Sequence, residues 1–176
     1  MKTLLVGTLL ALAGLSSVAA AADDNWFIRG EAGNSRLSVD GESGDDTSLG
    51  IRGGYFFNRN FGAEIFYTNL GKDSGGGATF KIDAWGVGVI GKKDFGPNDT
   101  GMFVSGRAGI ARTKAKISGG GASFSDTSTK GYAGVGIGYD FTRNFGLSLN
   151  VDYNGVDVFG DGGHVVTTTV GLEGRF

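Results

Sequence analysis

The last twelve residues of the chain, 165–176 (VVTTTVGLEGRF), alternate strictly between two kinds of side chain. One phase is apolar and ends on the aromatic ring of Phe176, whereas the other carries opposite charges at Glu173 and Arg175. A period of two indicates a β-strand, because successive side chains point to opposite sides of the pleat. A strand with one apolar face, one charged face and an aromatic residue at its end is typical of the closing strand of a transmembrane β-barrel.

The first 22 residues (MKTLLVGTLLALAGLSSVAAAA) have the pattern of an export signal. Lys2 gives a positive start, residues 4–15 are apolar but too short to span a bilayer, and residues 20–22 form a small-residue cleavage site. We therefore expect a cleaved signal peptide over residues 1–22 and one barrel domain over residues 23–176. An uncleaved membrane anchor is the alternative, and the short apolar run disfavours it. No later apolar stretch approaches the length of about 20 residues that a transmembrane helix needs.

The same alternation recurs along the rest of the chain and predicts about eight strands. The predicted strands cover residues 26–39, 47–57, 61–70, 78–93, 102–117, 129–141, 145–154 and 165–176. Short turns at 58–60, 95–100 and 142–144 alternate with longer polar loops at 40–46, 71–77, 118–128 and 155–163. The fold class expected is all-β: a closed, antiparallel, eight-stranded transmembrane barrel with an up-and-down meander. The register of residues 78–93 stays open, since residues 84–91 are small or apolar in both phases and a bulge near Gly86 would shift them.

A soluble barrel of the lipocalin type also alternates, but with its apolar face turned inward. The inverted arrangement is favoured by the polar phase, which mixes Gly, Ser and Thr with few charges and suits a crowded lumen. The chain has 35 glycines, which a narrow lumen accommodates. Aromatic residues also recur at strand ends, as expected for a girdle at the membrane boundary. The predicted girdle consists of Trp26, Tyr55, Phe61, Tyr139, Phe145 and Phe176.

Charges of both signs fall in the inward phase and predict a lumen network. Its expected members are Arg29, Glu31, Arg52, Glu64, Arg107, Asp152, Glu173 and Arg175. Eight strands leave room for side chains but little for a channel. Buried charges must be paired whether or not anything passes. The interpretation is therefore an interior filled by polar and charged side chains, with a small-conductance pore gated by these pairs as the alternative.

An internal repeat carries a family resemblance: GYFFNRNFGAEIFY at residues 54–67 is echoed by GYDFTRNFGLSLNV at 138–151. With the opening Trp26-Phe27-Ile28 and the ending GLEGRF, this pattern resembles the small eight-stranded outer-membrane proteins of Gram-negative bacteria, the group of the OmpA transmembrane domain, the OmpX/Ail type and the opacity-like porin-family barrels. The resemblance implies the cell outer membrane, contact with its lipid and lipopolysaccharide, and Phe176 as a signal for the outer-membrane assembly machinery. In adhesin-like relatives the outward loops contact host or other extracellular ligands.

Several function classes find little support. A net charge of −2 offers no basic surface for nucleic acid, and the absence of cysteine removes disulfides and thiolate metal sites. His164 is the only histidine, and lipid A chemistry would need Ser123 or Ser125 to reach it from another loop. We expect no enzyme, no cofactor and no metal, and a monomer. The prediction is an integral outer-membrane barrel with a structural or surface-interaction, adhesin-like role; a lipid A-modifying enzyme and a soluble carrier are the weaker alternatives.

Overall fold

The computed structural model describes residues 25–39, 42–75, 78–119, 122–158 and 161–176. The predicted signal peptide over residues 1–22 and the predicted start of the domain at residue 23 lie outside the described residues. Within the part that is described, no helix is both long and apolar enough to cross a membrane.

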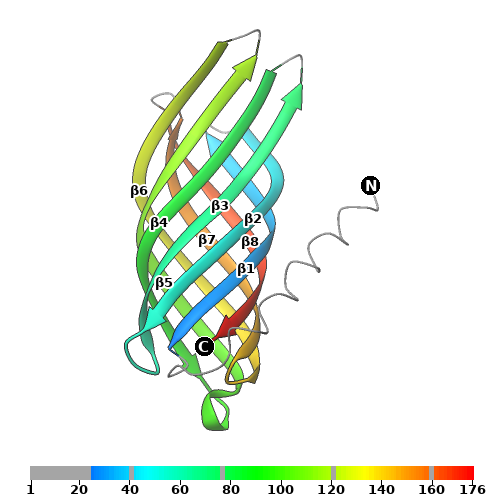
Figure 1. The fold of residues 1–176 in the computed structure, drawn as a ribbon. Helices are drawn as coiled ribbons and strands as arrows, with labels where there is room; N and C mark the ends of the chain where they lie inside the picture. Colours follow the sequence, from blue (N-terminus) through cyan, green and yellow to red (C-terminus); the bar gives the residue numbers. More distant parts are fainter. Residues whose placement is uncertain (1–24, 40–41, 76–77, 120–121, 159–160) are drawn as a thin grey trace.

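Eight antiparallel strands close into one barrel in sequence order, so the predicted fold class is confirmed. Figure 1 shows the short turns and the C-terminus at one end of the barrel and the extended hairpins β3–β4 and β5–β6 at the other. A single 3-10 turn, η2 (Pro97–Asp99), lies between β4 and β5. The strands are β1 (Trp26–Val39), β2 (Glu42–Phe56), β3 (Phe61–Gly75), β4 (Ala78–Asp94), β5 (Gly101–Gly119), β6 (Ala122–Thr142), β7 (Phe145–Val158) and β8 (Asp161–Arg175).

The barrel closes where its first and last strands meet. β1 pairs with β8 from Phe27 opposite Arg175 to Val39 opposite Gly163. Beyond the paired strands, the backbones of Trp26 and Phe176 exchange two hydrogen bonds of 3.0 Å each. Closure matters because a membrane offers no water to the backbone groups of a free strand edge. The final strand thus completes the hydrogen bonding of the whole sheet.

Four of the predicted polar loops are shorter in the structure than the sequence indicated. Residues 42–46 belong to β2, residues 71–75 to β3, residues 118–119 and 122–128 to the β5–β6 hairpin, and residues 155–158 and 161–163 to β7 and β8. Their Gly, Ser and Asp content favours loops, but cross-strand pairing outweighs this weak intrinsic preference. The predicted loops at this end are therefore mostly paired hairpin arms.

The structure also settles the register of β4. Trp85, Val87 and Val89 are exposed and face outward, while Ala84 and Ile90 are buried in the lumen. β4 pairs with β5 without interruption, so there is no bulge near Gly86. The irregularity lies on β3 instead, between Asn69 and Gly71. Gly71 has φ +153°, a backbone conformation that other residues rarely adopt.

The outward face carries two rows of aromatic residues. The predicted row lies at the short-turn end. A second row, which was not predicted from the sequence, lies closer to the extended hairpins and consists of Tyr67, Trp85 and Tyr153, all exposed. On β7, eight residues separate Phe145 in the first row from Tyr153 in the second. That is roughly 27 Å along the strand and roughly 21 Å along the barrel axis at the usual tilt, close to the apolar band of about 25 Å in outer-membrane barrels.

Candidate functional site

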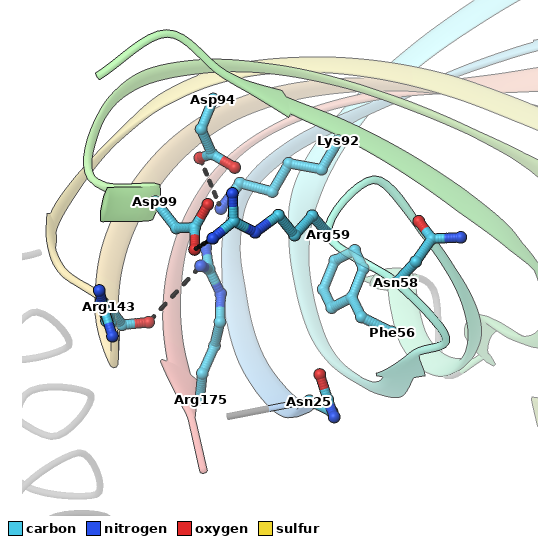
Figure 2. A pocket seen from close by; sticks show the side chains of 9 residues that line it. All are labelled: Asn25, Phe56, Asn58, Arg59, Lys92, Asp94, Asp99, Arg143 and Arg175. Atoms are coloured by element: carbon cyan, nitrogen blue, oxygen red, sulfur yellow. Dashed lines mark hydrogen bonds and ion pairs between the residues drawn. The ribbon is translucent and has the colours of Figure 1, made fainter. Parts of the chain in front are cut away.

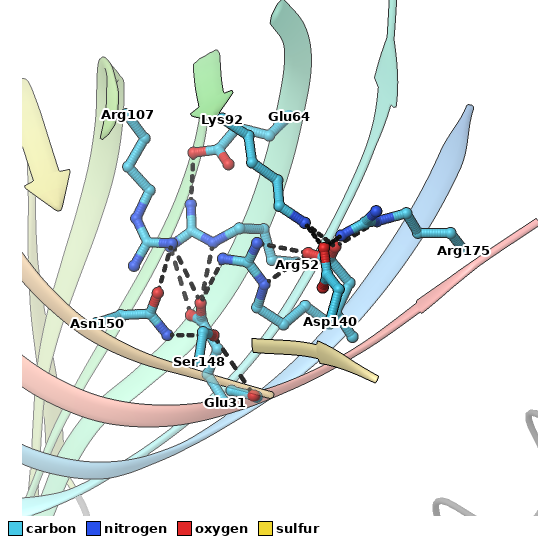
Figure 3. A network of polar contacts seen from close by, with 12 residues as sticks. Glu31, Arg52, Glu64, Lys92, Arg107, Asp140, Ser148, Asn150 and Arg175 are labelled. Atoms are coloured by element: carbon cyan, nitrogen blue, oxygen red, sulfur yellow. Dashed lines mark hydrogen bonds and ion pairs between the residues drawn. The ribbon is translucent and has the colours of Figure 1, made fainter. Parts of the chain in front are cut away.

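The middle of the lumen holds a layer of ion pairs that crosses from wall to wall. The Nη1 atom of Arg52 lies 2.6 Å from Glu64 Oε1, and its Nε atom lies 3.3 Å from Glu31 Oε1. Arg107 holds both carboxylate oxygens of Asp152, with Nε–Oδ1 and Nη2–Oδ2 distances of 2.5 and 2.6 Å. Figure 3 shows these arginines extended across the barrel toward carboxylates of other strands. Charge-assisted, bidentate hydrogen bonds of this kind hold the side chains in one geometry and also neutralise their charges.

A second layer of ion pairs lies nearer the short-turn end. Lys92 on β4 places its Nζ 2.5 Å from Asp140 Oδ2 on β6, and Arg175 Nη2 lies 2.8 Å from the same oxygen. Arg175 Nε also lies 2.8 Å from Glu173 Oε1, which ties this layer to β8. The other oxygen of Glu173 accepts hydrogen bonds from Arg29 at 3.0 and 2.5 Å. The two layers are therefore continuous through Arg29 and Glu173.

The structure brings all eight predicted lumen residues together. Seven are buried, and Arg175 is partly exposed at the mouth. Two members were missing from the predicted set, Lys92 and Asp140, and both are buried. With them, five cationic side chains face five carboxylates in one interior: Arg29, Arg52, Lys92, Arg107 and Arg175 against Glu31, Glu64, Asp140, Asp152 and Glu173. A sixth carboxylate, Asp94, lies 3.6 Å from Lys92 Nζ at the short-turn mouth. Each interior cation therefore has a carboxylate within 4 Å, which burial demands.

Apolar side chains form two clusters in the lumen, one beyond the central charged layer and one beside the layer at the short-turn end. The larger cluster lies toward the extended hairpins and consists of Phe66, Leu70, Ile82, Ala84, Ala111, Tyr132, Val156 and Val165. A smaller cluster of Phe27, Phe56 and Ile90 lies toward the short turns. The interior is therefore charged in the middle and mixed toward the extended hairpins, where buried polar residues such as Ser35, Thr113 and Asn154 lie among the apolar cluster. Burial of apolar surface adds to the packing there.

Tyr132 joins the charged layer to the larger apolar cluster. It was not predicted as a site residue. Its hydroxyl donates to Glu64 Oε1 at 2.6 Å, and its ring packs edge-on against Phe66 at a centroid distance of 4.9 Å. Phe66 in turn lies under the Arg52 guanidinium, 4.6 Å from the ring centroid. An aromatic residue with a polar tip suits this boundary, because one end meets charge and the other meets apolar neighbours.

One cavity within the described part of the lumen is very small. A cavity between the charged layer and the apolar cluster measures about 10 Å³, and Glu31, Thr68, Tyr132 and Thr169 are among the residues that line it. A cavity needs roughly 10–15 Å³ of such volume to hold one water molecule. A larger recess of about 500 Å³ lies at the short-turn mouth, where Figure 2 shows Arg59, Lys92, Arg143 and Arg175 around it. Lys92 and Arg175 of the second charged layer are among the residues that line this recess.

Comparison with known proteins agrees with this architecture. A protein of Haemophilus influenzae, described as uncharacterized, is 28% identical over 164 residues, which is 88% of this chain and 89% of that protein. The crystal structure of Neisserial surface protein A (NspA) matches 86% of this chain and 97% of its own, with 19% identity and a TM-score of 0.75. The crystal structure of Ail from Yersinia pestis, in complex with the heparin analogue sucrose octasulfate, matches 86% of this chain and 97% of its own at 22% identity and a TM-score of 0.65.

The model of the outer membrane protein beta-barrel domain matches residues 8–176. The chain belongs to this family. Its place is therefore the outer membrane, as the fold and its structural neighbours also indicate.

The predicted aromatic girdle lies at the short-turn end as expected from its strand positions. Trp26 packs edge-on against Tyr55 with ring centroids 5.0 Å apart, and Phe61, Tyr139 and Phe145 are exposed. Phe176 is partly exposed beside Trp26, to which its backbone is hydrogen-bonded. These positions are those of residues at a membrane boundary. The role of Phe176 as an assembly signal stays a prediction.

His164 lies on the outer wall and not within a polar site. It stacks on Tyr153 with ring centroids 5.1 Å apart and an interplanar angle of 20°. Ser123 and Ser125, the predicted candidates for a partner, belong to β6, and β7 separates β6 from β8. They are therefore not cross-strand neighbours of His164. Among the described residues, no group of three or more His, Asp or Glu side chains is arranged to hold a metal ion.

Proposed function

We propose that the protein is a closed, non-conducting outer-membrane scaffold that presents its extended hairpins at the cell surface. The observation that carries the proposal is the packed middle of the lumen: the central ion pairs lie directly below the larger apolar cluster, and the cavity between this charged layer and this cluster measures about 10 Å³. Hydrated ions need a wetted path, and a dry apolar layer opposes one. The charges hold the interior together and are not a gate.

The orientation that we propose places the extended hairpins outside the cell and the short turns in the periplasm. Small outer-membrane barrels have short periplasmic turns and longer extracellular segments. β5 and β6 have 19 and 21 residues, against 14 each for β1 and β7, so this hairpin extends furthest. Ail, which shares the fold, is described as an attachment invasion locus protein and was solved with a heparin analogue. That description supports a surface-interaction role for the hairpins of this chain.

Planar-bilayer recordings of the refolded protein test the closed lumen. We expect no stepwise conductance from the wild type at low or high salt. The matched variant carries Leu70→Ala, Ile82→Ala and Val165→Ala, which thin the larger apolar cluster and keep the ion pairs. Reproducible single-channel steps from the wild type would overturn the proposal and restore the small pore. Steps from the triple variant alone would support the apolar cluster as the barrier.

Thiol labelling of intact cells tests the presentation of the hairpins. The chain has no cysteine, so single substitutions give an unambiguous signal. Ser125→Cys lies on the arm of β6 and Arg59→Cys in the turn after β2, and both side chains are exposed. A maleimide that does not cross the outer membrane should label the first variant and not the second. Labelling of only the second variant would show the opposite orientation and would overturn the proposal that the β5–β6 hairpin lies at the cell surface.

A further inference from the structure

A cluster of cations lies on the outer wall of β4 and β5, just beyond the upper aromatic row. Arg112, Lys114 and Lys116 occupy alternate positions of β5 and are all exposed. Arg112 pairs in register with Trp85, and Lys116 pairs with Lys81 on β4. Alternate residues of a strand lie roughly 6.8 Å apart, so the three β5 cations extend over roughly 14 Å from the membrane boundary outward. We call these four side chains the rim cations.

The rim cations have fewer carboxylates around them than the buried cations do, and only Lys81 forms an ion pair with a described residue. Among the described outward-facing residues of β4 and β5 beyond Trp85, the single carboxylate is Asp83. Asp83 accepts from Tyr67 at 2.8 Å and from Asn69 at 2.9 Å, and it lies 2.9 Å from Lys81. Within the described chain, no ion pair or side-chain hydrogen bond involves Arg112, Lys114 or Lys116.

The only anion among the strand partners of these three cations is Asp83, which pairs in register with Lys114 on β4. Their cross-strand neighbours on β6 are Thr129, Thr127 and Ser125, which are neutral. Like charges placed opposite each other, as Lys81 and Lys116 are, destabilise a sheet. Four cations with one engaged carboxylate therefore favour an external anion.

An apolar groove lies directly below the rim cations. It has a volume of about 450 Å³ and is lined by Ile28, Ile51, Gly53, Ile65, Trp85 and Val87, among others. Gly53 pairs with Ile28 on one side and Ile65 on the other, so the missing side chain lowers the outer surface between two isoleucines. Trp85 lies at the top of the groove and beside Arg112. The groove and the cation cluster thus share a border.

We propose that this face of the barrel binds one phosphorylated lipid of the outer leaflet, with an acyl chain in the groove and its phosphate groups on the rim cations. Charge complementarity selects an anionic head, and the groove selects a lipid over a soluble anion. The inference rests on the proposed orientation, which turns the rim cations toward the outer leaflet. Each cation near an anionic lipid surface contributes roughly a five-fold preference, so three uncompensated cations give a large combined preference.

The two tryptophans of the chain allow a test with an internal control. Trp26 and Trp85 are both 53% exposed, but only Trp85 lies at the proposed site. Single-tryptophan proteins, Trp26→Phe and Trp85→Phe, are refolded into phosphatidylcholine vesicles that contain a small fraction of phosphatidic acid with brominated acyl chains. Bromine quenches tryptophan on contact. We expect Trp85 to be quenched as if the brominated lipid were enriched roughly five-fold or more around it, and Trp26 to be quenched as in random mixing.

Two variants in the Trp26→Phe background separate the head site from the groove. The triple change Arg112→Gln, Lys114→Gln and Lys116→Gln should return Trp85 quenching to the random level. Gly53→Val fills the groove and should lower the enrichment while the charge stays the same. A Cβ atom at Gly53 would meet only the Phe27 carbonyl oxygen at 3.5 Å, an ordinary contact, so this variant should fold. Arg36→Gln removes an exposed cation elsewhere and should leave the quenching unchanged.

Three outcomes would overturn the inference. Equal quenching of Trp26 and Trp85 means that no site exists, and loss of the enrichment on addition of free inorganic phosphate means that the cations bind a soluble anion. The third outcome concerns soluble sucrose octasulfate. If the wild type binds it, the triple variant does not, and the lipid enrichment is the same in both, the rim cations bind a soluble polyanion. A heat-modifiable gel shift establishes folding for every variant. The conductance and labelling experiments are independent of these results, so the proposed function can stand when this inference fails.

Discussion

Inside the barrel, five cationic side chains face six carboxylates, counting Asp94 at the mouth, and each cation lies within 4 Å of an acid. On the outer wall of β4 and β5, the four rim cations share one carboxylate, Asp83. The two sets differ in what surrounds them. A buried charge has no solvent to compensate it, so its partner must come from the protein. A charge at the membrane boundary meets water and lipid heads, so its partner can come from outside.

The comparison teaches that charge balance separates structural from interacting groups in this barrel. Paired interior charges serve the fold, whereas the unbalanced rim is the part of the wall for which we propose binding. The same distinction applies to the glycines. Several inward-facing glycines make room for large side chains, whereas outward-facing glycines such as Gly30 and Gly106 have nothing within 4 Å of an added Cβ.

The largest effect should come from removal of a central interior cation. Arg52→Met leaves Glu31 and Glu64 without the guanidinium that lies between them. An uncompensated buried charge costs about 3–5 kcal/mol, so the free energy of unfolding in vesicles should fall by that order. Urea titration followed by the heat-modifiable gel shift measures it.

Lys114→Met is the matched control for Arg52→Met on the outer wall. It removes an exposed cation that has no ion pair within the described residues, so stability should change little. Equal losses for the two variants would show that the interior pairs are not special. A normal gel shift and urea midpoint for Glu64→Ala would argue against the network in the same way.

The next effect concerns the glycines. A Cβ atom at Gly88 would overlap the Tyr132 hydroxyl and the Ala108 carbonyl, so Gly88→Ala must displace the ring that is bonded to Glu64. Overpacking of this kind costs about 1–3 kcal/mol. Gly106→Ala, on the outward face of β5, should be neutral or slightly stabilising. The urea midpoints of the two variants measure the difference, and a larger loss for Gly106→Ala would contradict the inside-outside distinction.

Much of this organisation is readable from the sequence, because a period of two assigns each side chain to a face. Glu64 alternates with exposed Phe61, Ile65 and Tyr67, and it is buried as that phase requires. Lys92 was missed because β4 is small or apolar in both phases. Once Trp85 faces outward, however, the same alternation places Lys92 inside. The missing signal was thus the register of a single strand.

Other features could not be read from the pattern. Arg107 and Asp152 are 45 residues apart and Lys92 and Asp140 are 48 apart, so their pairing depends on strand tilt and side-chain reach across the lumen. Leu70, Val156 and Val165 lie next to polar Gly-rich segments, which hid the apolar cluster that they form. Hairpin length was underestimated because local composition does not report cross-strand pairing.

The smallest effect should come from an ion pair that is complete but exposed. Arg36 Nε lies 2.8 Å from Asp45 Oδ1, and the two side chains are 63% and 64% exposed. This pair separates pairing from burial: it has the geometry of the interior pairs without their surroundings. Water and salt screen exposed pairs, and the cost of ordering two long side chains offsets most of the gain.

We therefore expect Arg36→Gln to leave the urea midpoint unchanged within error at low salt and at 0.5 M salt, with the gel shift intact. Asp45→Asn should behave alike, since neither residue leaves a buried charge behind. A shift as large as that of Arg52→Met would mean that pairing alone stabilises this barrel. In that case the uncompensated rim cations would be a source of instability, and an external anion would be needed for the fold itself.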